Sequence, residues 1–358
     1  MSDVTPKMLE GVGRLALVGV AKNCGKTTTL NYLLGSPATD GRTVGLVSIG
    51  IDGEASDLLI GTKKPPIHVE AGHWLVTARD ALTRSSARVE YVDSLGFSTP
   101  LGEVVLVRVL EPGTVVLAGV RHRGDLEAAL ELLEVHGVDL ALIDGAYGRT
   151  LAARGDVSDA VIVSTGAILS EDVEVICERT AELVDRLALE PVEADWQERL
   201  LRRAITQGRC LLGGPQTAPV ELPAQSALLG LRQAVDLWRD EIRAVAVPGL
   251  VSDSVVEQLL GAPVGQIQSG DPKPVRTLLV PDGTVLHADS RLLRRLLAHA
   301  GRGWQIRAIE PANVVAISIN PTGVQGHRVE PGALGRALAE RWPSICIFNP
   351  LHSNAAPA

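Results

Sequence analysis

The most informative segment of the chain is Gly19-Val20-Ala21-Lys22-Asn23-Cys24-Gly25-Lys26-Thr27-Thr28. It overlaps the end of the all-apolar run Leu15–Val20, which is typical of a strand buried on both faces of a parallel sheet. It leads into Lys26–Leu34, where leucines recur at helical spacing until Gly35-Ser36-Pro37 ends the pattern. A strand, a glycine-containing turn and a helix in this order form the setting of a phosphate-binding P-loop.

The chemistry of such a loop comes from its backbone and from a few side chains. Backbone N–H groups at the start of a helix form an anion site, and the helix dipole adds positive potential. We expect Gly25 to let the backbone approach the phosphates, Lys26 to reach the β- and γ-phosphates, and Thr27 to bind Mg²⁺. The other residues expected to line the nucleotide are Gly19, Lys22, Asn23, Cys24 and Thr28. The alternative is a Gly-Lys-Thr turn that binds nothing.

Two carboxylates that follow apolar runs are candidates for Mg²⁺ binding and catalysis. Asp144 ends the run Val138–Ile143, and a carboxylate at the carboxyl end of a parallel strand faces the crevice where ligands bind. Asp52 follows the predicted strand Thr43–Ile49, with Glu54 as the second choice for orienting water or metal there. The predicted catalytic residues are Lys26, Asp52 and Asp144, and the predicted metal ligands are Thr27, Asp52 and Asp144. Each Asp also has a structural alternative, as a cap or in an Asx-turn.

Weaker candidates lie elsewhere along the chain. His68, His73 and His122 could line the site, but no pair of them has a metal-binding spacing. Ser164-Thr165-Gly166 and Asn320-Pro321 each follow an apolar run, so both are expected at the edge where ligands bind. Asn320 would contact the nucleotide base or start a turn. The chain has no Asn-Lys-x-Asp motif, which favours ATP over GTP.

Apolar strands alternate with amphipathic helices through much of the chain. The other predicted strands are Thr114–Ala118, Ala160–Ser164, Arg243–Val247, Thr277–Val280, Asn313–Ile319 and Ser344–Phe348. The other predicted helices are Asp125–His136, a helix capped by Ser170, Ser254–Leu260, Ser290–His299 and Ala333–Arg341. This alternation predicts an α/β fold: a P-loop NTPase domain with a mostly parallel sheet and helices on both faces, plus a second, smaller α/β domain. We place the boundary near residue 190, which gives a nucleotide-binding domain over 1–190 and a C-terminal domain over 191–358.

The stretch from Gly61 to Gly102 lacks this alternation. We predict an irregular insertion there with one or two edge strands, and long insertions of this kind are often functional.

Composition narrows the possible classes of protein. The chain has 358 residues, 46% of them hydrophobic and 21% charged, which is typical of a packed globular protein. Its formal net charge of −8 argues against nucleic acid as the main partner. The sequence shows no leader-like segment and no apolar run of membrane length, and its four cysteines form no CxxC motif. We therefore expect a cytoplasmic protein with reduced thiols and no membrane partner.

Several segments, in order over most of the chain, together resemble one family. These segments are Ala21–Asn31, Ser48–Glu54, Lys64–Gly72, Thr99–Val104, Asp144–Ala146, Ser164–Ala167 and Ile319–Gly323. The Gly-x5-Gly-Lys-Thr spacing of the loop resembles that of dethiobiotin synthetase and the cobyrinate amidases, which share a class with the Min and nitrogenase-iron-protein ATPases. The chain as a whole resembles the KamB family, the reactivase subunit associated with lysine 5,6-aminomutase.

The resemblance implies a role in maintaining a radical enzyme. Adenosylcobalamin-dependent aminomutases sometimes inactivate and retain a damaged cobalamin, and a reactivase would use ATP binding and hydrolysis to drive its exchange. The implied cofactors are ATP and Mg²⁺. The implied partners are the aminomutase, a second reactivase subunit and a second copy of the chain in a homodimer. Lys22 would then contact phosphate, across the dimer in that arrangement.

Two other functions stay open from the sequence. The first is a ligase or kinase that acts on a small carboxylate metabolite with ATP, as dethiobiotin synthetase does, with a pocket lined from residues 61 to 102. The second is a degenerate P-loop domain that serves only as a scaffold.

Overall fold

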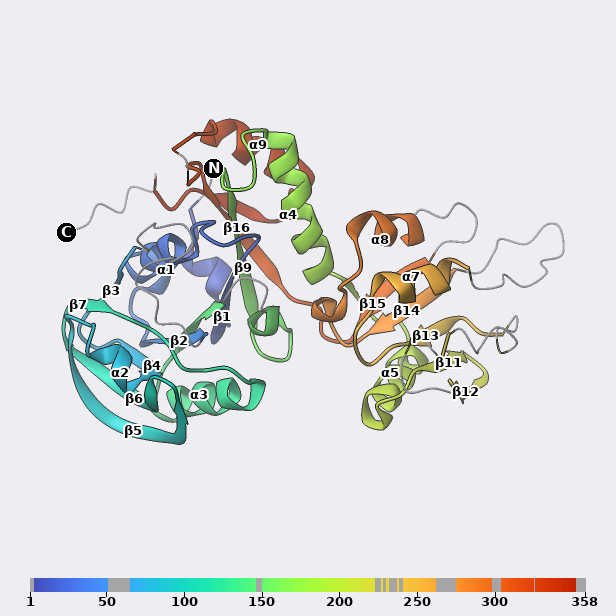
Figure 1. Cartoon of the computed structure of the whole chain (residues 1–358), viewed down its shortest axis with the longest axis horizontal. Helices are drawn as coiled ribbons and strands as arrows, with labels where there is room; N and C mark the ends of the chain where they lie inside the picture. The colour runs from blue at the N-terminus through green and yellow to red at the C-terminus, as the bar shows by residue number, and fades with distance from the viewer. Residues whose placement is uncertain are drawn as a thin grey trace. The chain divides into compact units, whose positions relative to one another are not determined.

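The computed structural model describes residues 3–50, 65–145, 150–222, 241–261, 275–297, 304–324 and 326–351, together with residues 227, 230, 231 and 237. The chain divides into two compact units (Figure 1). The first combines Met1–Val184 with Asn313–Ala358, and the second is Asp185–Ala312. The second unit is therefore inserted into the chain of the first.

The first unit is built on a nine-stranded sheet with the order β17-β16-β9-β1-β8-β2-β4-β6-β5. Its strands are β1 (Arg14–Gly19), β2 (Val44–Ile49), β4 (Trp74–Ala78), β5 (Arg88–Thr99), β6 (Gly102–Glu111), β8 (Leu140–Gly145), β9 (Ala160–Gly166), β16 (Val314–Asn320) and β17 (Cys346–Phe348). All neighbours from β17 to β4 are parallel, whereas β6 and β5 add antiparallel pairs at one edge. The prediction of a large, mostly parallel α/β sheet is confirmed.

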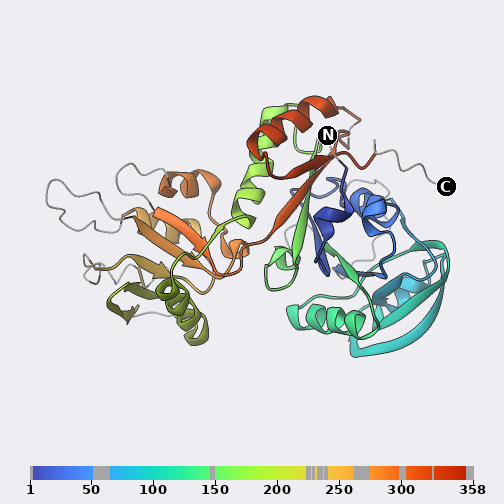
Figure 2. The same cartoon turned by 180° about the vertical axis from the view of Figure 1, so that it is seen from behind.

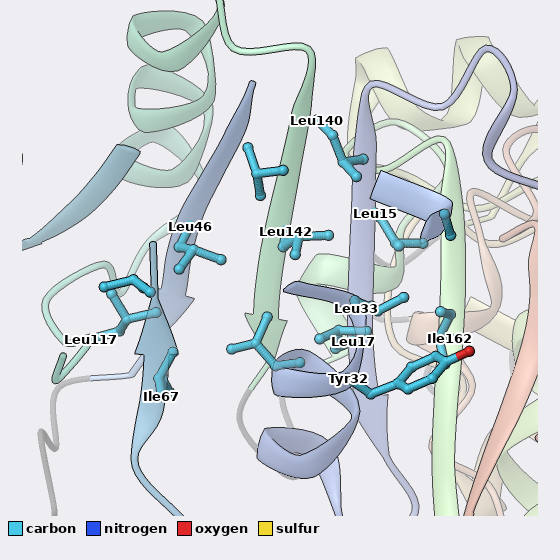
Figure 3. Close-up of a cluster of buried hydrophobic side chains, with 14 of the residues drawn as sticks. Leu15, Leu17, Tyr32, Leu33, Leu46, Ile67, Leu117, Leu140, Leu142 and Ile162 are labelled. Carbon is cyan, nitrogen blue, oxygen red and sulfur yellow. The ribbon is translucent and has the colours of Figure 1, made fainter. Parts of the chain in front are cut away.

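Helices cover both faces of this sheet. They are α1 (Lys26–Leu34), α2 (Arg79–Leu82), α3 (Arg123–Val135), α4 (Val173–Leu187) and α9 (Pro331–Arg341), with short 3₁₀ turns η1 (Pro6–Leu9), η2 (Pro37–Thr39) and η3 (Thr150–Ala153). On one face, leucines of β1, β2 and β8 pack with Leu33 of α1 (Figure 3). Gly45 of β2 points to the other face, where an added Cβ would lie 2.9 Å from Leu133 of α3. Thr165 of β9 also faces that side and bonds Thr180 of α4.

The stretch from 61 to 102 is more regular than the sequence predicts. In its described part, β3 (Ile67–Val69) pairs with β7 (Gly113–Val115) in a separate two-stranded sheet. β4 joins the main sheet beside β2, and β5 with β6 forms a long hairpin that extends the same edge (Figure 2). The predicted irregularity was therefore wrong for the described residues, whereas the predicted edge strand is present as β5, the last strand in the sheet order. Most of β5 is only partly buried, so its sequence does not show the strong alternation of a strand with one buried face.

The second unit is built on a six-stranded sheet with the order β10-β15-β14-β13-β11-β12. Its strands are β10 (Glu190–Pro191), β11 (Leu211–Gly214), β12 (Thr217–Glu221), β13 (Ala244–Ala246), β14 (Arg276–Val280) and β15 (Trp304–Ala308). Its helices are α5 (Asp195–Gln207), α7 (Asp253–Leu260) and α8 (Ser290–Leu297), with the 3₁₀ turn η5 (Gly283–Val285). β10, β15, β14 and β13 run parallel, and β11 pairs antiparallel with β13 and β12.

The predicted boundary near residue 190 lies close to the passage from the first unit to the second at Val184–Asp185. The assignment of residues 191–358 to one C-terminal domain differs from the observed division. Residues 313–358 belong to the first unit, because β16 pairs in parallel with β9 and β17 pairs with β16. Among the described residues, none of the helices combines the length and apolar character that a bilayer crossing requires.

Candidate functional site

The loop after β1 turns directly into α1. Two of its residues have left-handed backbone conformations, Asn23 with a φ of 62° and Gly25 with a φ of 101°. Gly25 is also the N-cap of α1. A Cβ added to Gly25 would lie 3.1 Å from the Cβ of Asn320 on β16. Glycine is thus favoured at position 25 both by the backbone angle and by the close approach of a neighbouring strand.

Lys26 bends back over the beginning of the loop. A Cβ added to Gly19 would lie 2.8 Å from Lys26 Nζ and would collide with Cys24 Sγ. Cys24 is buried, and its thiol fills the space against Gly19. The ammonium group of Lys26 makes no ion pair or hydrogen bond with the part of the chain that the structure describes. A half-buried cation is therefore held over the concave side of the loop.

The loop also presents hydrogen-bond donors that have no acceptor. Within the described residues, the backbone N–H groups of residues 25–28 bond to no protein acceptor, and the buried Asn23 Nδ2 has no partner. A buried donor without an acceptor is destabilising, so the Asn23 amide is expected to bind a group from outside the chain. α1 has no acidic residue in its first turn, so its positive end is not neutralised by its own side chains. The arrangement fits an anion such as a phosphate group.

Asp144 lies on the strand next to the loop. β8 pairs in parallel with β1 on one side and β2 on the other, and Asp144 is in register with Leu17 and Ser48. Leu142 packs in the same core cluster as the leucines of α1. Asp144 follows two residues later, so it faces the side of the sheet on which α1 and Thr27 lie. Its carboxylate and the Thr27 hydroxyl have the oxygen chemistry that Mg²⁺ prefers.

Two predicted residues lie outside the described residues. They are Asp52 and Glu54, and the described chain before them ends at Gly50, which exchanges hydrogen bonds with Gly119 and Val120. The described chain resumes at residue 65, and Asn31 of α1 bonds its backbone there. Asn31 Nδ2 donates to Pro66 O at 2.8 Å, and Asn31 Oδ1 accepts from His68 N at 3.0 Å.

The ends of β9 and β16 lie beside the loop, although the sequence analysis assigned β16 to the C-terminal domain. Val20 N donates to Ser164 O at 3.0 Å, and Ser164 is in register with Ser318. Asn320 Oδ1 accepts from Thr322 N at 3.2 Å, so this residue does start a turn. A Cβ added to Gly166 would collide with the Asn320 carbonyl, which explains the glycine there.

The three histidines do not form a cluster. His68 is exposed on β3, and His122 is exposed before α3, where its N–H donates to Asp125 Oδ2. His73 Nδ1 accepts from Glu70 N at 3.1 Å. Burial lowers the pKa of His73 below its ordinary value, against the opposing effect of Glu70. Among the described residues, no group of three or more His, Cys, Asp and Glu side chains could hold a metal.

Sequence reasoning missed a buried hydroxyl cluster behind the loop, formed by Thr29, Ser164 and Ser318. Ser164 was noted only as part of a strand end. The available signal was the presence of polar residues inside the apolar runs of β9 and β16 and on the inner face of α1. Their convergence was not visible, because the three residues are far apart in sequence.

Comparison of the chain with protein-family models, curated proteins and solved structures finds no match.

Proposed function

We propose that this chain is a P-loop NTPase that binds ATP and Mg²⁺ at the loop between β1 and α1. The observation that carries the proposal is the row of donors without acceptors at the start of α1, with Lys26 over the loop. Lys26 would bind the β- and γ-phosphates, and the backbone from Asn23 to Thr28 would surround them. Gly19 and Cys24 shape the loop, and Lys22 adds positive charge beside it.

The proposed metal site combines Thr27 with Asp144. Thr27 would place its hydroxyl on Mg²⁺, and Asp144 would hold the ion directly or through water. Asp52 stays a proposed catalytic and metal residue, because its part of the chain follows β2, the strand next to Asp144. The bound ion would neutralise charge on the transferred phosphate, while Lys26 orients it. ATP is preferred to GTP in this proposal because the chain lacks an Asn-Lys-x-Asp motif.

At the level of biological role, we propose an ATP-dependent reactivating factor for an adenosylcobalamin-dependent aminomutase. The support is the resemblance of the ordered motifs to the KamB family, together with a fold whose mostly parallel sheet suits a nucleotide-driven switch. The proposal includes the aminomutase and a second reactivase subunit as partners, a homodimer around nucleotide and a cytoplasmic location.

The alternative is an ATP-dependent ligase or kinase acting on a small carboxylate. It predicted a metabolite pocket lined from residues 61 to 102. Much of the described part of that stretch forms β4, β5 and β6 in the main sheet. No contact of these strands specifically favours the alternative, so the reactivase is the function proposed.

Two measurements on the purified protein test this proposal. Calorimetric titration with ATP and with GTP, each with Mg²⁺, should give saturable binding of ATP. Hydrolysis should then be followed alone and with an aminomutase inactivated by turnover. Stimulated hydrolysis with recovery of mutase activity is the expected result. Steady hydrolysis that is indifferent to the mutase would favour the ligase or kinase, and a metabolite screen for product would identify it. Absence of ATP binding would overturn the whole proposal.

A further inference from the structure

Three buried hydroxyl groups meet directly behind the loop. Thr29 Oγ1 lies 2.7 Å from Ser318 Oγ and 3.3 Å from Ser164 Oγ, and Ser318 Oγ lies 2.8 Å from Ser164 Oγ. The three residues come from α1, β16 and β9 and are at most 1% exposed. We refer to them as the hydroxyl cluster. Buried hydroxyls need partners, and here each provides the partners of the others.

The hydroxyl cluster contacts the loop at its most constrained residue. Thr29 Oγ1 also donates to Gly25 O at 3.1 Å, and Thr29 N donates to the same oxygen at 2.9 Å. Gly25 is the residue whose left-handed backbone turns the loop into α1. The orientation of its peptide group determines where the following N–H groups point.

Neighbouring contacts fix the loop from the same side. Ser164 O accepts from Val20 N at the beginning of the loop. Asn320, two residues after Ser318 on β16, lies against Gly25. The neighbouring strands β9 and β16 therefore contact the loop at both its ends.

We propose that Thr29, Ser164 and Ser318 are positioning residues that hold the Gly25 peptide in the orientation required for phosphate binding. In this proposal the three residues contact neither phosphate nor metal, and they act only through the loop backbone. The inference rests on the proposed nucleotide binding and adds residues to it that the P-loop motif does not contain.

The chain provides a closely matched control on the opposite face of β9. Thr180 of α4 is also fully buried, donates to the carbonyl four residues earlier at Ile176 O, and bonds a strand hydroxyl, Thr165 Oγ1. Both of these distances are 2.7 Å. Thr29 and Thr180 therefore have the same kind of contacts, but only those of Thr29 lead to the loop.

The experiment compares Thr29→Val with Thr180→Val by calorimetric titration of ATP with Mg²⁺ and by thermal unfolding without ligand. Both variants should lower the melting temperature by similar amounts. We expect Thr29→Val to weaken ATP binding about tenfold and Thr180→Val by less than about twofold, since each lost hydrogen bond has a modest effect on its own. Thr29→Ser keeps the hydroxyl and should bind within about twofold of wild type.

Ser318→Ala provides a second variant if Thr29→Val fails to fold, because it removes a partner of Thr29 without changing α1. It should weaken ATP binding in the same direction. Equal ATP affinity of the Thr29, Ser318 and Thr180 variants would overturn the positioning role while leaving nucleotide binding intact. Failure of the wild-type chain to bind ATP would overturn both.

Discussion

Each unit contains an apolar strand that leads into an Asp-Gly pair, and the two pairs have different environments. In the first unit, β8 ends in Asp144-Gly145, half-buried beside the loop and on the side of α1. In the second unit, β14 leads into Asp282-Gly283. Asp282 is 2% exposed, and its Oδ1 accepts from Thr284 N at 2.7 Å to cap η5. The same sequence pattern therefore gives a candidate metal ligand in one unit and a helix cap in the other.

The neighbouring helices account for the difference. α1, next to β8, begins with Gly25 and Lys26 and has no acidic residue in its first turn. α7 follows β13, the neighbour of β14, and it has Asp253 in its first turn. The positive end of α7 is thus balanced by its own carboxylate, whereas that of α1 is available to an anion. An Asp-Gly pair after a strand indicates a nucleotide site only when the adjacent strand supplies such a helix.

The largest effect should come from the cation over the loop. Lys26→Ala removes the half-buried ammonium group from the anion site, so ATP affinity measured by calorimetry should fall about a hundredfold or more. The melting temperature should stay within a few degrees of wild type, because Lys26 makes no ion pair with the described chain. The matched control is Lys7→Ala, an exposed lysine in η1. Unfolding of the Lys26 variant, or unchanged ATP affinity, would contradict the assignment.

The two Asp residues should respond differently to the same substitution. Asp144→Ala should reduce Mg²⁺-dependent ATP hydrolysis about tenfold or more. Asp282→Ala should leave hydrolysis unchanged but lower the free energy of unfolding by about 1 kcal/mol, because it removes a buried cap. Steady-state hydrolysis and urea unfolding measure the two quantities. If Asp144→Ala affected only stability, the two Asp-Gly pairs would be equivalent and the metal assignment would fail.

The sequence predicts local structure well and the convergence of distant residues poorly. α1 has the predicted bounds, since its leucine spacing and the glycine after it are local signals. The loop and Asp144 were both predicted at the ligand-binding edge of the sheet, because both follow buried parallel strands. The sheet that β16 joins could not be predicted, since the sequence of a parallel strand does not indicate which strand it pairs with. Thr29 and Ser318 were missed for the same reason: their contact spans 289 positions.

A smaller effect should follow from removing the charge that balances α7. Asp253→Asn keeps a side-chain oxygen that can accept from Asp289 N, the bond that Asp253 Oδ1 makes at 2.6 Å. Only the interaction with the helix dipole is lost, so unfolding in urea should show a loss of about 0.5 kcal/mol at low salt. The loss should shrink at high ionic strength, where surface charges are screened. If the loss of unfolding free energy did not depend on salt, the stabilisation of α7 by Asp253 would not be electrostatic.

The last comparison concerns two buried cysteines, one in each unit. Cys210 precedes β11 in the second unit, and burial raises the pKa of its thiol to about 11. At pH 8 only about a thousandth of this thiol is ionised, against about a tenth for a thiol with a pKa of 9.0. Alkylation by iodoacetamide, followed by mass spectrometry of the native protein, should therefore be about a hundredfold slower at Cys210 than at an exposed thiol.

The same thiol predicts how stability changes at alkaline pH. Both states keep the proton below pH 9, but above it the unfolded chain loses the proton while native Cys210 retains it up to about pH 11. Stability should thus fall as the pH rises above about 9, and Cys210→Ala should remove that part of the slope.

Cys24 is also buried but lies against Gly19 in the loop, so saturating ATP should slow its alkylation and leave Cys210 unaffected. Equal protection of the two thiols by ATP would show that nucleotide stabilises the whole chain rather than covering the loop.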